Sequence, residues 1–137
     1  MSKSLALDWL KSSYSDIVTL NKISDDDFIT HVTAFHSQQS TEKCLKAILE
    51  YNDTKVPSKH DLRMLNRLVS DYITIDDDLI LDSLNTLYID SRYPGDMGLL
   101  PHGKPTLEQA QEFYEFAKHI FYRVCKLLEI DPEEVKK

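Results

Sequence analysis

The residues best suited to chemistry in this chain are an arginine and two nearby tyrosines. Arg92 and Tyr93 directly precede a stretch, 94–105, that contains all three glycines and three of the five prolines of the sequence. Because glycine and proline interrupt regular structure, 94–105 is predicted to be an elaborated loop. A guanidinium at the end of a helix can bind a phosphate through two parallel hydrogen bonds, and the rings of Tyr88 and Tyr93 can stack on a base. The start of this loop is therefore a candidate binding site.

The same residues also have structural interpretations. Arg92 can cap the last carbonyl groups of the helix before it, and the two tyrosines can pack at the edge of a core. Asp96 can orient Arg92, although aspartate is more typical of a turn residue. The loop therefore indicates a place for a site without naming its ligand.

A second polar group follows helical spacing within the segment 24–51. Its members lie three or four residues apart and are expected to point in one direction: His36, Gln39, Lys43, Lys46 and Glu50, here called the polar stripe. The rest of the segment, from Phe28 to Leu49, is apolar nearly all round, which predicts a central helix. Polar groups on such a helix are costly unless they line a groove, an interface or a cavity. We interpret the stripe as an anion-accepting or subunit-contacting surface.

These side chains also have two purely structural interpretations. Glu42 with Lys46, four residues later, fits an ordinary surface ion pair, and Gln39 with Lys43 has the same spacing. His36 can be a hydrogen-bonded, half-buried imidazole, and His60 can simply stand where a helix begins at Asp61.

Other kinds of chemistry find no support in the sequence. It contains no nucleophile–base pair, no glycine-rich phosphate loop and no spacing typical of metal ligands. The acidic triplets 25–27 and 76–78 are predicted to cap helices rather than to bind Mg²⁺. No metal and no cofactor are expected.

Helices account for nearly all of the remaining sequence. They are predicted at about 4–20, 24–51, 61–72, 76–90 and 107–129, followed by a short frayed tail from Asp131. The last of these helices follows a capping-box pattern that begins at Thr106. Short connections favour antiparallel neighbours, so the expected fold is an all-α, up-and-down bundle of about five helices in one domain, 1–137.

Composition narrows the functional classes further. A net charge of −7 argues against a surface that coats nucleic acid, because such binding neutralises many phosphates. The two cysteines, Cys44 and Cys125, lie in helical segments and are predicted to be buried free thiols in a reducing compartment. With no leader-like segment and no apolar run of membrane-spanning length, a cytoplasmic location is expected.

Three segments together resemble the HEPN (higher eukaryotes and prokaryotes nucleotide-binding) domain family. Residues 35–47, FHSQQSTEKCLKA, resemble its "FHxQQxxEKxLKA" helix. Residues 59–62, KHDL, followed by Leu65, resemble its "HDL…L" start of the third helix, and 88–94, YIDSRYP, resemble its "Y…SRYP" element. The likeness extends over nearly the whole chain, because the order of helices also fits.

The resemblance implies a five-helix bundle that is usually a homodimer. Short members of this kind are nucleotide-binding modules or substrate-binding partners of minimal nucleotidyltransferases, in toxin–antitoxin-like pairs. The predicted ligand-contacting residues are His36, Gln39, Lys43, Lys46, His60, Tyr88, Arg92 and Tyr93.

The resemblance also implies that many other members are metal-independent endoribonucleases, in which four to six residues stand between an arginine and a histidine. Here the next histidine after Arg92 is His102, ten residues on, so the nuclease pattern is not matched. The sequence therefore favours a non-catalytic binding module. The alternatives are a ribonuclease that uses Arg92 with His102 or His36, and a dimeric scaffold without a ligand.

Overall fold

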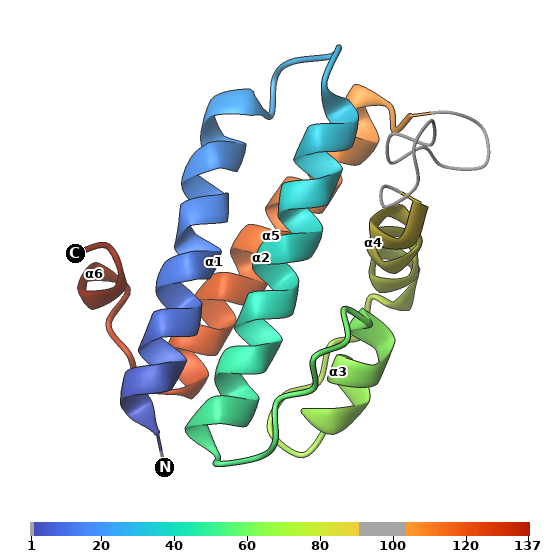
Figure 1. The fold of residues 1–137 in the computed structure, drawn as a ribbon. Coiled ribbons are helices and arrows are strands. Elements are labelled where there is room, and N and C mark those ends of the chain that lie inside the picture. Colours follow the sequence, from blue (N-terminus) through green and yellow to red (C-terminus); the bar gives the residue numbers. More distant parts are fainter. Residues whose placement is uncertain (1, 91–103) are drawn as a thin grey trace.

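The computed structural model describes residues 2–90 and 104–137, and every element in these two ranges is a helix (Figure 1). The helices are α1 (Lys3–Ile23), α2 (Thr30–Tyr51), α3 (Leu62–Leu68), α4 (Asp78–Asp90), α5 (Leu107–Leu127) and α6 (Pro132–Val135). The expected all-α bundle is confirmed.

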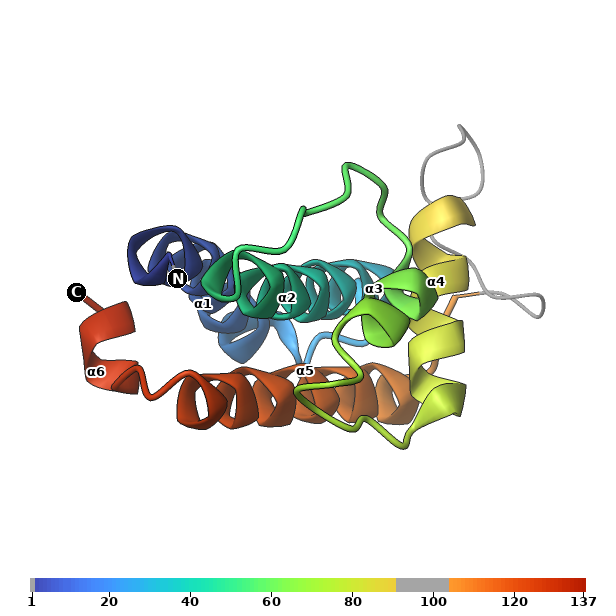
Figure 2. The same ribbon diagram turned by 90° about the horizontal axis from the view of Figure 1, so that it is seen from below.

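Three long helices form the body of the bundle. α1 and α2 lie side by side in opposite directions, and α5 packs behind them (Figure 1). α4 runs across these helices, since it is seen nearly end-on in Figure 1 and lengthwise in Figure 2. α4 therefore does not lie alongside the three long helices. Among these three, α5 runs in the same direction as α2.

α2 is the centre of the bundle, as its composition predicts. It contacts α1, α5, α4 and α3, and its apolar residues Leu45, Ile48 and Leu49 are fully buried. α5 contributes the aromatic side of the core through Phe113 and Phe121. Burial of these large side chains stabilises the bundle and fixes the direction in which the polar stripe of α2 can point.

The connection between α1 and α2 differs from the sequence prediction. α1 continues to Ile23, and α2 begins at Thr30 instead of within 24–27. Asp26 accepts a hydrogen bond from the backbone N–H of Phe28 through its side chain, which closes a turn and diverts the backbone from a helix. Phe28 is 79% exposed, so its predicted place on the buried central helix is wrong.

The other helix ends follow local signals. The capping box at Thr106 is confirmed, because its side chain accepts from the N–H of Gln109 while the Gln109 side chain accepts from the N–H of Thr106. Asp77 accepts from the N–H of Ile80 at the start of α4, the capping role expected for 76–78. α5 ends at Leu127, two residues early, and Glu129 has the left-handed φ of 54° that follows many helix ends.

Two short segments also differ from expectation. α3 ends at Leu68 rather than near Tyr72, because the N–H of Tyr72 turns back to the carbonyl of Val69. The tail after Asp131 is not frayed, since it forms α6 and buries Val135 against α1. Throughout 2–90 and 104–137, every helix is too short or too polar to cross a lipid bilayer.

Candidate ligand-binding site

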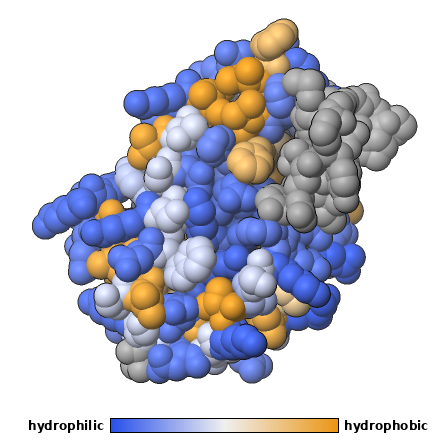
Figure 3. All heavy atoms as spheres, in the orientation of Figure 1, coloured by the Kyte–Doolittle hydropathy of each residue, from blue (hydrophilic) through white to orange (hydrophobic). Residues whose placement is uncertain are grey.

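The polar stripe of α2 lies along its seam with α1, on the face of the bundle opposite α5. Hydrophilic side chains cover the middle of this face, and apolar side chains gather in separate patches toward its ends (Figure 3). Two acidic residues organise the polar side chains, Asp16 from α1 and Glu42 from α2. Each carboxylate holds two basic groups.

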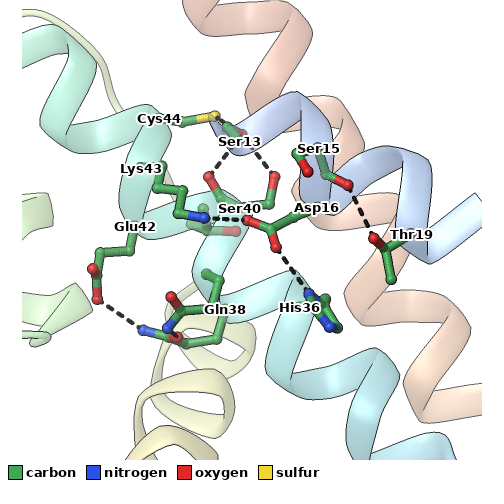
Figure 4. Close-up of polar contacts among 12 residues, drawn as sticks. Ser13, Ser15, Asp16, Thr19, His36, Gln38, Ser40, Glu42, Lys43 and Cys44 are labelled. Atoms are coloured by element: carbon green, nitrogen blue, oxygen red, sulfur yellow. Dashed lines mark hydrogen bonds and ion pairs between the residues drawn. The ribbon is translucent and has the colours of Figure 1, made fainter. Parts of the chain in front are cut away.

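The first cluster surrounds Asp16, which projects from α1 between two side chains of α2 (Figure 4). One carboxylate oxygen accepts from Nδ1 of His36 at 2.8 Å, and the other accepts from Nζ of Lys43 at 2.8 Å. The Asp16 side chain is only 9% exposed, whereas His36 and Lys43 are 28% and 21% exposed. The carboxylate is thus buried beneath two basic groups that reach the surface.

This arrangement leaves hydrogen-bond donors available at the surface. Lys43 uses one of its three N–H groups on Asp16 and keeps two, while His36 donates from Nδ1 and would add an Nε2–H donor only as the imidazolium. Because Asp16 fixes both side chains, a further acceptor would meet donors that are already in position. The cluster is suited to hold an anionic oxygen.

The second cluster is buried around Glu42. Its carboxylate accepts from Nζ of Lys46 at 3.1 Å, from Nε2 of Gln38 at 3.1 Å and from Nδ1 of His60 at 2.9 Å. The side chains of Glu42 and Lys46 are 4% and 5% exposed, so the interpretation of this pair as a surface ion pair is wrong. His60 joins the segment before α3 to the middle of α2 through this contact.

Lys46 also contacts α1. Its ammonium group lies 5.4 Å from the centre of the Trp9 ring, within the range of a cation–π interaction. Glu42, Lys46 and Trp9 therefore form a continuous polar and aromatic connection from α2 to α1. Loss of either partner of this buried ion pair should destabilise the fold, because the remaining charge would be buried without a counter-charge.

A third polar contact between α1 and α2 involves a thiol. Ser13 lies 2.8 Å from Oγ of Ser40 and 3.1 Å from Sγ of Cys44 (Figure 4). Burial raises the pKa of Cys44 to about 12 and that of Cys125 to about 11. Both thiols are free and buried, as the sequence predicts, and such pKa values keep them protonated and poorly nucleophilic.

The structure brings the sequence-predicted residues together in part. His36 and Lys43 meet on Asp16, and Lys46 and His60 meet on Glu42. Gln39 donates to the side chain of Gln38 and not to Lys43, so the suggested Gln39–Lys43 pair is wrong. The side chain of Tyr88 and all of Arg92, Tyr93, Asp96 and His102 lie outside the described residues.

Two residues of the site are missed by sequence reasoning. Asp16 is four residues from Leu20 and one from Ile17, and both of these are buried. A carboxylate on the buried side of a helix is the sequence signal that could have pointed to Asp16. Trp9 shares helical spacing with the apolar residues Leu5 and Ile17, which indicates only an apolar side of α1, and the structure adds its contact with Lys46. No group of three or more His, Cys, Asp or Glu side chains within the described ranges could hold a metal ion.

Comparison with known proteins identifies the family. The model of the HEPN domain matches residues 6–128, which run from the first turn of α1 to just beyond the end of α5. No curated protein and no solved structure shows a significant match to the chain. The family match extends over most of the sequence and agrees with the all-helical fold and with the motifs that lie along α2. The chain belongs to the HEPN domain family.

Proposed function

We propose that this chain is a non-catalytic nucleotide-binding module that serves as the substrate-binding or accessory partner of a minimal nucleotidyltransferase, in a toxin–antitoxin-like pair. Membership of the HEPN family supports a nucleotide-related or ribonuclease-type module. The geometry of the polar stripe favours the first of these two classes.

The observation that carries the proposal is the Asp16 cluster. Nζ of Lys43 and Nδ1 of His36 each lie 2.8 Å from Asp16, so both basic groups are held at the surface and Lys43 keeps two further N–H donors. A lysine acts on a phosphate as a point charge, and the imidazolium form of His36 adds a directed hydrogen bond from Nε2. These are the contacts that a nucleotide phosphate requires.

Arg92, Tyr88 and Tyr93 complete the proposed site on the ground of their sequence motif. Arg92 follows α4 by two residues, and α4 packs on α2, the helix that carries the stripe. We assign the guanidinium to a phosphate and the two rings to base contact. We further propose a homodimer, because the half-exposed Phe35 beside His36 suits a two-fold contact.

A ribonuclease is the second candidate, and its motif is incomplete. Nine residues stand between Arg92 and His102, whereas the resemblance implies four to six in active members. His36 donates from Nδ1 to Asp16, which leaves Nε2 able to act as a base, so Arg92 with His36 stays the second arrangement for a ribonuclease. Cleavage would need a general base within hydrogen-bond reach of the attacking 2′-hydroxyl group of the RNA, whatever the pKa of that base.

Calorimetry with ATP tests the proposed binding. The wild-type chain should bind ATP weakly, and both Lys43→Ala and Arg92→Ala should weaken binding about tenfold, since a charge-assisted hydrogen bond contributes roughly 1.5–3 kcal/mol. Lys118→Ala is the matched control, because Lys118 lies on α5 in a surface pair with Glu115. Raised salt should weaken ATP binding as well.

The same preparation separates the binding module from the ribonuclease. Single-stranded RNA incubated with the wild type in EDTA should stay intact. Cleavage that persists in EDTA and disappears in Arg92→Ala and His102→Ala would replace the binding module with a ribonuclease. Co-expression with a nucleotidyltransferase encoded in the neighbouring reading frame should yield a complex on gel filtration, and two separate peaks would remove the proposed partner.

A further inference from the structure

A pocket of about 410 Å³ lies at one end of the α1/α2 seam. It is lined by Leu5, Asp8, Trp9 and Ser12 of α1 and by Glu50 of α2. Its volume falls in the range of small-molecule sites, and its lining combines an aromatic ring, an aliphatic side chain and a few polar groups, as such sites do. Neither the family match nor the sequence motifs assign a ligand to it.

The pocket and the Asp16 cluster belong to one row of side chains. On α1, Asp8, Ser12 and Asp16 are spaced by four residues and so lie on one face. On the antiparallel α2, Glu50 lies at the pocket, Lys46 lies over the ring of Trp9, and Lys43 reaches Asp16. Seven residues of helix, about 10 Å, separate Trp9 from Asp16. A ligand with an aromatic end and an anionic end can span both sites.

The two charged groups of the pocket, Asp8 and Glu50, are hydrogen-bond acceptors. The carboxylates of Asp8 and Glu50 have no hydrogen bond or ion pair with any described residue. Leu5, which is 48% exposed, forms an apolar wall of the pocket. A carboxylate binds best where two N–H donors lie side by side. The Watson–Crick edge of guanine offers this pair, N1–H and the N2 amino group. Adenine and uracil instead place an acceptor next to their donor.

We propose that the α1/α2 seam binds a guanine nucleotide, with its base in the pocket and its phosphates toward Lys43 and His36. The ring of Trp9 stacks on the base, and Glu50, with Asp8 beside it, accepts from N1–H and the N2 amino group. This inference rests on the proposed nucleotide-binding function, replaces the base contact assigned there to Tyr88 and Tyr93 with one at Trp9, Glu50 and Asp8, and adds the identity of the base.

Trp9 provides a direct test, because it is the only tryptophan of the chain. Its fluorescence should be quenched on titration with GTP, and ATP and UTP should bind about tenfold or more weakly, since one good two-point contact to a base edge discriminates by roughly 5- to 150-fold. Calorimetry with the same three nucleotides reports binding anywhere on the protein. Trp9→Phe should keep the helical fold and weaken GTP binding.

A change of one carboxylate to an amide tests the base contact. An amide offers one acceptor and one donor, which matches the edge of adenine and mismatches that of guanine. Glu50→Gln should therefore weaken GTP binding about tenfold or more and bring ATP close to parity. Asp8→Asn should weaken GTP binding less, and Glu115→Gln on α5 is the control that should leave all three affinities unchanged.

The outcomes separate this inference from the proposed function. GTP binding by calorimetry without a change in Trp9 fluorescence, and without an effect of Glu50→Gln, would place the nucleotide elsewhere and overturn the inference alone. Equal affinity for GTP, ATP and UTP, with quenching by all three, would overturn the guanine assignment. Absence of heat with every nucleotide at millimolar concentration would overturn the proposed function together with the inference.

Discussion

Nζ of Lys43 on α2 lies 2.8 Å from the carboxylate of Asp16 on α1. The lysine that sequence spacing marks as a phosphate ligand is thus already neutralised from within the bundle, and the same carboxylate also holds His36. An incoming anion must share these donors with Asp16. The carboxylate fixes the donors in place and at the same time competes with the ligand, so its removal should have two measurable and opposite effects.

Asp16→Asn preserves the shape of Asp16 and removes its charge. We expect the free energy of unfolding to fall by about 1–3 kcal/mol, because two hydrogen bonds to a charged group are weakened. We expect the affinity for ATP and GTP to rise by about two- to tenfold, because a negative charge close to the phosphate site is lost. Urea denaturation measures the first effect and calorimetry the second.

Asp71→Asn is the control for this prediction, since Asp71 is exposed in the turn after α3. It should change neither quantity. A fall in nucleotide affinity in Asp16→Asn would show that the fixing of Lys43 and His36 outweighs the competing charge, and equal affinity would separate Asp16 from the ligand altogether.

Glu42→Gln should destabilise the bundle more strongly than Asp16→Asn. Lys46 is 5% exposed and its ion pair with Glu42 is buried, so the change leaves a buried ammonium group without its counter-charge. Loss of one partner of such a pair costs about 3–5 kcal/mol. The double variant Glu42→Gln with Lys46→Met should recover much of that loss, because no buried charge remains. Urea denaturation with circular dichroism measures all three chains.

Glu115→Gln is the matched control for Glu42→Gln, since Glu115 also pairs with a lysine of its own helix but lies at the surface. It should shift the free energy of unfolding by no more than about 0.5 kcal/mol. A Glu42→Gln chain as stable as this control would mean that Lys46 is hydrated in solution and that the buried network contributes little.

Much of the fold is predictable from local sequence because the relevant signals act over one helical turn. The capping box at Thr106 satisfies backbone N–H groups at the start of α5. The apolar residues on nearly all sides of α2, such as Leu45, require a central position for this helix. The turn before Thr30 is not predictable in the same way. The side chain of Asp26 can serve a helix start or a turn equally well, and its hydrogen bond to Phe28 decides for the turn.

The candidate site is predictable only in outline. The polar stripe is visible as a spacing on one helix, and His36 and Lys43 do converge. Their partner Asp16 is 27 residues before Lys43 and on another helix, so its role depends on how α1 packs against α2. The same holds for Trp9, whose spacing fits an apolar core face whether or not Lys46 lies over its ring.

Phe35→Glu tests the homodimer proposed above. Phe35 is 37% exposed and its ring meets the imidazole of His36 edge-on, so a carboxylate here would place charge in a two-fold contact. Light scattering should give twice the 15.9 kDa chain mass for the wild type and one chain mass for Phe35→Glu. Leu127→Glu is the control at 39% exposure on α5 and should remain a dimer. A monomeric wild type at high concentration would contradict the proposed contact.

Stability should depend on Cys44 at alkaline pH. Burial raises the pKa of Cys44 from 9.0 to about 12, so between these values the folded chain keeps a proton that the unfolded chain has lost. Unfolding then releases a proton, and rising pH favours the unfolded state by up to about 1.4 kcal/mol per pH unit. The contribution of the buried Cys44 thiol to stability is fully present below pH 9.0 and is lost as pH rises toward 12.

Cys44→Ser tests this dependence, because serine does not titrate in this range and can still hydrogen-bond to Ser13. The difference in free energy of unfolding between wild type and Cys44→Ser should shrink from pH 9 to 10.5 in urea denaturation. Cys125→Ser should show the same trend over a narrower window, because burial raises the pKa of Cys125 only to about 11. Wild-type and Cys44→Ser stabilities that stay parallel across this range would show that the Cys44 thiol is hydrated in the folded protein.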